Sequence, residues 1–265
     1  MPDAATAGSA LEAVLRRDRT LVQASLAALT ALAWGYLLWL ALGMGMSVDG
    51  MVGVARSWTT SEFVLMFVMW TVMMVGMMTP SAAPMVLIYA RVGRQATLQG
   101  KPLAATGFFA GGYLLAWSAF ALAATAAQWG LHRALLLTPM MASANTMLSG
   151  AVLIVAGVYQ WTPVKQACLR HCQAPLSFIL QLGGFRRALR RSLALGLRHG
   201  LYCIGCCWAL MLLLFVGGVM NLLWIAVLSI VVLAEKVMPA GNWLPRVTGV
   251  VLFGAGIVVL SGAFS

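Results

Sequence analysis

An imidazole and three thiols lie close together in one segment of this sequence, at His199, Cys203, Cys206 and Cys207. On a helix, His199, Cys203 and Cys206 fall within about 60° of one another, and Cys207 widens the arc to about 100°. Thiolate and imidazole ligands favour zinc, copper(I) or iron–sulfur clusters over hard cations. A thiolate buried among apolar groups is costly alone, and a bound metal compensates by keeping it deprotonated. The segment therefore predicts a soft-metal site.

A second group of the same kind precedes it, at Cys168, His171 and Cys172. Positions i, i+3 and i+4 share one helix face, so these three side chains are also predicted metal ligands. The alternative for both groups is that the cysteines are small apolar core residues, which is common. The clustering of the cysteines favours the metal, and Cys168 and Cys172 lie in a basic connection where burial as apolar residues is not expected.

Methionine forms the third group, with 17 residues in the chain. Those that share one predicted helix face are Met66, Met69, Met73 and Met77. They cover an arc of about 80°, with Met74 and Met78 beside them. Others, at Met44, Met46 and Met51, surround the preceding loop. Thioether is a soft ligand that suits copper(I), although methionine also fills gaps in helix bundles. The continuity of the row favours a copper(I) path.

Zinc is the competing metal, and it would favour carboxylate or histidine along the route. The apolar runs contain almost none of either, apart from Glu235 beside Lys236. Ionisable groups inside a membrane usually have a partner. Two interpretations of Glu235 stay open: it pairs with Lys236 at the interface, or it accepts a hydrogen bond from His199. Copper(I) is therefore favoured over zinc.

The elements that position these residues are predicted to be membrane-spanning helices. Hydrophobic residues make up 62% of the 265, charged residues only 9%, and the mean hydropathy is +0.93. A soluble domain carries about 25% charged residues. Apolar runs of about 20 residues recur, each long enough to cross a bilayer as a helix. The predicted fold is an all-α, polytopic transmembrane bundle with about seven spans.

The predicted spans lie near 21–44, 63–90, 104–127 and 145–161, then in two halves of 201–234, and at 247–264. The uncharged run 201–234 would be roughly 50 Å long as one helix, so Gly217-Gly218 and Asn221 are expected to break it. Residues 1–20 form a tail before a single helical domain, 21–265. A connection at 162–198 carries Cys and His, with a short helix that has Thr162 as N-cap, Pro163 in first position and an end before Pro175.

Charge gives the orientation. With the N-terminus inside, the inner segments hold 15 of the 17 Lys and Arg residues, and the outer segments hold only Arg56 and Arg133. This bias predicts an N-terminus inside and a C-terminus outside, in a bacterial inner (cell) membrane. The net charge of +11 comes from basic residues that flank the apolar runs, so it indicates membrane orientation and contact with anionic lipid. It does not indicate nucleic-acid binding.

The sequence also resembles a known family over roughly residues 30–262. The shared segments are Met69-Trp70 through Met73-Met74, Met77-Met78, Pro80-Ser81 with Pro84, Lys165-x-x-Cys168-x-x-x-Cys172-x-x-Pro175, Gly196-x-x-x-Gly200-x-Tyr202-Cys203-x-Gly205-Cys206-Cys207-Trp208, and Glu235-Lys236. They resemble the predicted metal-binding integral membrane proteins, some of which are described as copper chaperones. The resemblance implies a metal, with copper first.

The sequence thus predicts a membrane protein that binds copper(I) and moves or delivers it, with methionines outside and Cys/His sites at the inner face. Its expected partners are the metal ion, membrane lipid, and a metallochaperone or an assembly partner of a copper enzyme. No hydrolytic or ATPase motif occurs, so an enzyme is not predicted. Two alternatives stay open: a thiol–disulfide protein linked to quinone through Cys203-x-x-Cys206, and an assembly subunit with structural cysteines.

Overall fold

The computed structural model describes residues 4–45, 58–99, 106–137, 142–143, 145–181, 188–238 and 243–262. All regular structure in these ranges is helical, which confirms the all-α prediction. The helices are α1 (Ala4–Gly45), α2 (Thr60–Leu98), α3 (Thr106–Arg133), α4 (Thr146–Gln160), α5 (Pro163–Gln173), α6 (Pro175–Gln181), α7 (Leu189–Leu212), α8 (Leu214–Gly217), α9 (Leu222–Val237) and α10 (Trp243–Gly262).

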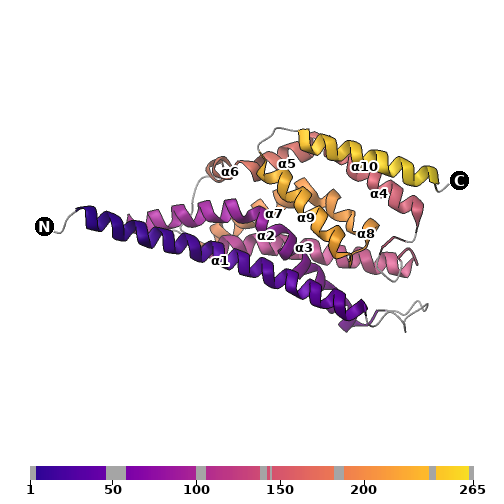
Figure 1. The fold of residues 1–265 in the computed structure, drawn as a ribbon, viewed down its shortest axis with the longest axis horizontal. Helices are drawn as coiled ribbons and strands as arrows, with labels where there is room; N and C mark the ends of the chain where they lie inside the picture. The colour runs from indigo at the N-terminus through magenta and orange to yellow at the C-terminus, as the bar shows by residue number, and fades with distance from the viewer. Residues whose placement is uncertain are drawn as a thin grey trace.

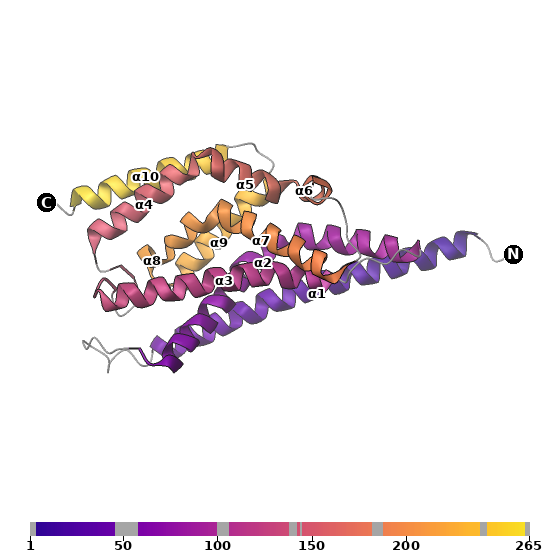
Figure 2. The same ribbon diagram turned by 180° about the vertical axis from the view of Figure 1, so that it is seen from behind.

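The helices form an elongated bundle in which α7 and α9 lie between two outer layers (Figure 1). One layer is the pair α4 and α10, which run side by side, and α1 runs along the opposite edge of the bundle (Figure 2). α3 packs against both α2 and α7, and α5 also packs on α7. The central helix α7 therefore contacts α5, which carries the other cysteines, and α3, which links it to the methionine-bearing α2.

Local sequence explains the bend between α4 and α5. α5 begins as predicted, with Thr162 as N-cap accepting a hydrogen bond from the Lys165 backbone amide and Pro163 in the first turn. The two helix axes differ by 65°. α2, by contrast, continues through Pro80 and Pro84 as one helix of 39 residues. At 1.5 Å per residue it is roughly 58 Å long, more than one membrane thickness.

The long apolar run 201–234 breaks where the glycines predict. α8 ends at Gly217, and Gly218 has a φ of 94°, a conformation that favours glycine. Asn221 then caps α9, because its side-chain oxygen accepts a hydrogen bond from the Trp224 backbone amide. The Trp224 indole donates to the Leu213 carbonyl at 2.7 Å and closes the turn. α9 thus leaves α7 as a separate helix that carries Glu235 and Lys236.

Glycines bring α3 and α7 into backbone contact. A Cβ atom at Gly112 would collide with the Leu193 carbonyl of α7, and one at Gly196 would collide with the Phe109 carbonyl of α3. Gly200, one turn further along, would meet the Ala116 Cβ. Small residues four apart allow this close approach in helix pairs. We call this contact the glycine seam.

Among the described residues, five helical segments are long and apolar enough to cross a membrane: Thr20–Gly43, Thr60–Ala96, Thr106–Arg133, Leu189–Gly217 and Trp243–Gly262. The bent pair α4 and α5 would make a sixth. These lengths are compatible with membrane insertion. α9 has 16 residues, slightly less than a full crossing. Seven spans and the inside N-terminus stay predictions. α7 begins at Leu189, inside the connection predicted at 162–198.

Candidate metal centre

Thiols from two helices meet at the centre of the bundle. The Cys172 Sγ of α5 lies 4.0 Å from the Cys206 Sγ of α7, and its thiol also lies close to that of Cys203. Cys203, Cys206 and Cys207 are all buried, with 2% exposure or less. The thiols of Cys206 and Cys207 both donate to the Cys203 carbonyl, at 3.1 and 2.9 Å. We call Cys172, Cys203, Cys206 and Cys207 the thiol cluster; all four cysteines are free.

A buried ammonium lies against the thiol cluster. The Lys236 Nζ of α9 is 2.9 Å from the Cys203 Sγ and 3.0 Å from the Ser81 Oγ of α2. On the other side, the Tyr113 hydroxyl of α3 is 3.2 Å from the same sulfur and donates to the Met78 carbonyl, also at 3.2 Å. Groups from α9 and α3 therefore contact the Cys203 sulfur of α7, and α2 holds both of them through Ser81 and the Met78 carbonyl. The ammonium can balance the charge of a thiolate, which is the form that binds metals.

The fifth cysteine, Cys168, approaches α7 at a glycine. Its side chain is half-buried, and its Sγ would lie only 2.8 Å from a Cβ built on Gly205. Glycine at this position lets α5 lie against α7, which brings Cys172 to the cluster one turn later. The two cysteine groups that the sequence presented separately are thus neighbours in the fold. The neighbouring Tyr159 hydroxyl, from α4, donates to the Gly205 carbonyl.

The two histidines predicted as ligands, His171 and His199, lie among aromatic rings. The His171 ring stacks on Tyr202 with centroids 4.4 Å apart, and its Nδ1 lies 2.8 Å from the Ala167 carbonyl. The His199 ring packs against Phe178 and Tyr113 at centroid distances of 5.4 and 5.7 Å. His199 is buried, and its Nδ1 has no hydrogen-bond partner in the described part of the chain. His199 therefore retains a free ring nitrogen.

The methionine row lies inside the bundle along α2. Met69, Met73 and Met77 are 2% exposed or less, and Met66 at the far end is half-buried. At that end the Gln128 amide nitrogen lies 3.9 Å from the Met66 Sδ. At the other end the Met78 Sδ lies 4.0 Å from the Lys236 Nζ, the same ammonium that contacts Cys203. The row therefore ends at the thiol cluster. Met46 and Met51 lie outside the described residues.

Glu235 has neither of the partners expected for it. Its carboxylate accepts from Lys165 at 2.7 Å, and both side chains are almost fully buried. Gln160 donates to the same carboxylate at 3.3 Å, and the Gln173 side chain donates to the Glu235 carbonyl at 2.7 Å. Pairing with Lys236 and hydrogen bonding to His199 were both wrong. Adjacent residues on a helix point in different directions, so Lys236 faces Cys203 while Glu235 faces α5.

This ion pair holds the short helix that carries two cysteines. Lys165 and Gln173 lie at the two ends of α5, and both reach Glu235 of α9. Lys165 and Lys236 had been counted as loop charges at the inner face, but both are buried. Sequence reasoning missed Lys236, Lys165 and Tyr113 as parts of the site. A lysine at the end of an apolar run was the one signal for Lys236, whereas nothing in the local sequence distinguished Tyr113.

Within the described ranges, no three side chains of His, Cys, Asp or Glu are already arranged to hold a metal ion together. Cys172 and Cys206 form a close sulfur pair in the thiol cluster, and other contacts of its sulfurs are made to an ammonium, a hydroxyl and a backbone carbonyl. Methionine sulfur, a further soft donor, lies beside them at Met78.

Most of the sequence, including the part that forms this site, matches a known protein family. The family model described as PpoB2, a copper chaperone, matches residues 67–259, which is well over half of the chain. The protein belongs to the PpoB2 copper chaperone family. The matched region begins within the methionine row and contains the thiol cluster, Lys236 and the Lys165–Glu235 pair. No curated protein and no solved structure matches the chain.

Proposed function

We propose that this member of the copper chaperone family binds copper(I) as cargo at the thiol cluster and passes it along the methionine row. The family supports a role connected with copper. The observation that carries the finer proposal is the meeting of Cys172 and Cys206, 34 residues apart, beside the end of the methionine row. The proposed ligands are Cys172, Cys203 and Cys206.

The geometry of the sulfurs supports a shared ion. A metal–thiolate bond is about 2.3 Å in zinc sites, so two sulfurs on one ion are at most about 4.6 Å apart. The 4.0 Å between Cys172 and Cys206 falls within that limit. Thiolate and thioether ligands select copper(I), whereas the nearest carboxylate, Glu235, is already paired with Lys165. This donor set favours copper(I) over zinc.

The remaining candidates take secondary roles in this proposal. Cys168 lies beside the cluster, Cys207 is its member without a ligand role, and His199 supplies a buried free nitrogen one turn before Cys203. His171 is held against Tyr202 and contributes packing. Met66, Met69, Met73 and Met77 form the path, with Met66 at its outer end. In this proposal the protein lies in a cell membrane with its N-terminus inside. It delivers copper(I) to a metallochaperone or to a copper enzyme under assembly.

Copper(I) binding under anaerobic conditions tests the site. We expect the purified wild-type protein to retain copper(I) against a competing chelator, and Cys203→Ser/Cys206→Ser to lose it, since two thiolates are removed. Cys207→Ser, at the edge of the cluster, should retain most of the affinity and serves as the matched control. Equal copper retention in the wild type and the double variant would reject the thiol cluster as the binding site.

Thiol–disulfide exchange is the second candidate, favoured by the same Cys172–Cys206 approach. Disulfide formation would shorten the 4.0 Å separation to about 2.05 Å, a small movement of α5 against α7. Quinone reduction and a measurable reduction potential that disappears in Cys206→Ser would support this function. A copper-binding wild type without redox turnover would exclude it.

A further inference from the structure

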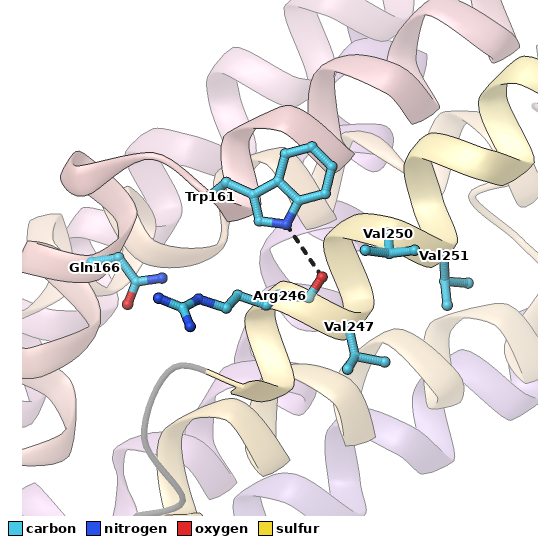
Figure 3. Close-up of a pocket in the computed structure, with 6 residues that line it drawn as sticks. All are labelled: Trp161, Gln166, Arg246, Val247, Val250 and Val251. Atoms are coloured by element: carbon cyan, nitrogen blue, oxygen red, sulfur yellow. Dashed lines mark hydrogen bonds between the residues drawn. The ribbon is translucent and has the colours of Figure 1, made fainter.

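A groove of about 590 Å³ lies outside the bundle core, between the bend that joins α4 to α5 and the beginning of α10. Its walls are Trp161, Gln166, Arg246, Val247, Val250 and Val251 (Figure 3). It is separate from the thiol cluster and takes no part in the proposed copper path. The Trp161 indole donates to the Arg246 carbonyl at 3.2 Å, so α4 and α10 are joined at the groove.

One end of the groove presents hydrogen-bond donors. The side chains of Gln166 and Arg246 point toward one another there, with the amide nitrogen of Gln166 directed at the guanidinium (Figure 3). In the described part of the chain the guanidinium has no carboxylate partner, and the groove contains no acidic residue. The Gln166 amide nitrogen donates one hydrogen to the Gln160 carbonyl at 3.5 Å, which leaves its second hydrogen and the guanidinium as donors. Such a pair of donors matches an anion with several oxygens, such as a phosphate.

The rest of the groove is apolar and faces outward. Val247, Val250 and Val251 stand at positions i, i+3 and i+4 on α10 and are 49%, 62% and 63% exposed. Arg246 lies three residues after the start of the candidate span Trp243–Gly262, which is the level of a membrane interface. Trp161 is also partly exposed there, in the position that tryptophan favours between headgroups and acyl chains.

We propose that this groove binds one anionic phospholipid. Its phosphate accepts hydrogen bonds from Arg246 and Gln166, and its acyl chain lies along the three valines. A single positive side chain and no carboxylate give the groove a net charge that an anionic lipid balances. A choline or ethanolamine headgroup brings its own cation, for which the groove has no carboxylate partner. Basic pockets between helices recognise anionic lipid headgroups in this way.

Native mass spectrometry of the full chain tests the proposal, with phosphatidylglycerol and phosphatidylcholine titrated into delipidated protein in detergent. We expect one phosphatidylglycerol to be retained in preference to phosphatidylcholine. Arg246→Gln should weaken that binding about tenfold, the effect of one lost charge-assisted hydrogen bond. Val250→Trp, which fills the apolar part and keeps the charge, should also weaken it. Inorganic phosphate should not compete.

Arg133→Gln is the matched control, because Arg133 also lies beside a tryptophan, with its guanidinium 5.1 Å from the Trp129 ring. It should bind phosphatidylglycerol as the wild type does. Equal losses in Arg246→Gln and Arg133→Gln would show general attraction to cationic side chains and overturn the proposal. Competition by inorganic phosphate would also overturn it, because the acyl chain would then not be recognised. Equal retention of both lipids would overturn it too, because the headgroup charge would then not be recognised.

Discussion

The methionine row and the thiol cluster are both buried sulfur sites, but they are held in different ways. The row is one face of α2, and Met69, Met73 and Met77 pack within an apolar core. The thiol cluster is assembled from α5 and α7. Groups from α3 and α9 contact Cys203, and Ser81 of α2 contacts the same ammonium as Cys203. One region depends on the periodicity of a single helix, and the other on how several helices meet.

That difference indicates different tasks. Thioethers are neutral, so a cation that moves from one methionine sulfur to the next does not have to separate from a negative charge. An ion can therefore exchange between successive sulfurs. A cluster with thiols, an ammonium and a hydroxyl can stabilise a charged ligand at one place. The apolar row is suited to passage and the polar cluster to retention. Variants that act on one region and spare the other can test this division.

The largest effect is expected at the ion pair that holds α5. Lys165→Met leaves the Glu235 carboxylate buried without its cation, which should cost about 3–5 kcal/mol of stability. The double variant Lys165→Met/Glu235→Leu removes both charges and should recover most of that loss. The measurement is the midpoint of thermal unfolding in detergent for the wild type and both variants. A double variant as unstable as the single one would show that the pair contributes through packing and not through charge.

The second effect concerns the glycine seam. Gly196→Ala places a methyl group against the Phe109 carbonyl, and separating α3 from α7 should cost about 1–3 kcal/mol. The same variant should weaken copper(I) binding, because α3 carries Tyr113 to the Cys203 sulfur. Gly254→Ala is the control, since a Cβ there meets nothing within 4 Å. Thermal unfolding and copper retention that match in the two variants would show that the seam does not position the cluster.

The smallest effect on stability, and a large one on function, is expected in the methionine row. Each of Met69→Leu, Met73→Leu and Met77→Leu conserves volume and should cost less than about 1.5 kcal/mol. The triple variant deletes three sulfurs, so copper(I) transfer to the thiol cluster should fall. The measurement is copper reaching the cysteines in proteoliposomes loaded from the methionine side. Undiminished transfer with normal folding would make the row a packing feature only.

Local features of the fold were predictable from sequence. The start of α5 at Pro163, the break after Gly217 and the burial of the methionine face all follow from capping, glycine conformation and helical periodicity. The site was predictable only in part. The spacing of Cys203 and Cys206 identified one face of α7, but the arrival of Cys172 depends on the bend between α4 and α5 and on the small Gly205.

Partners of buried charges were the least predictable part. Glu235 and Lys236 are neighbours in sequence, yet each pairs with a group from another helix. The direction of each side chain depends on how α9 is rotated about its axis between α2 and α5. That rotation cannot be predicted from a single sequence. The burial of Lys165 and Lys236 was not predictable for the same reason, because a count of charges on each side of the membrane does not say which lysines are solvated.

The contact between Lys236 and Cys203 also affects the net charge of the cluster once it holds a metal ion. The buried cluster already contains one positive charge, held 2.9 Å from a sulfur. Three thiolate ligands, the ammonium and one monovalent ion would together leave one negative charge, whereas without the ammonium two would remain. An uncompensated charge in a low-dielectric interior costs several kcal/mol. Lys236 would therefore lower the cost of holding a monovalent ion on three thiolates.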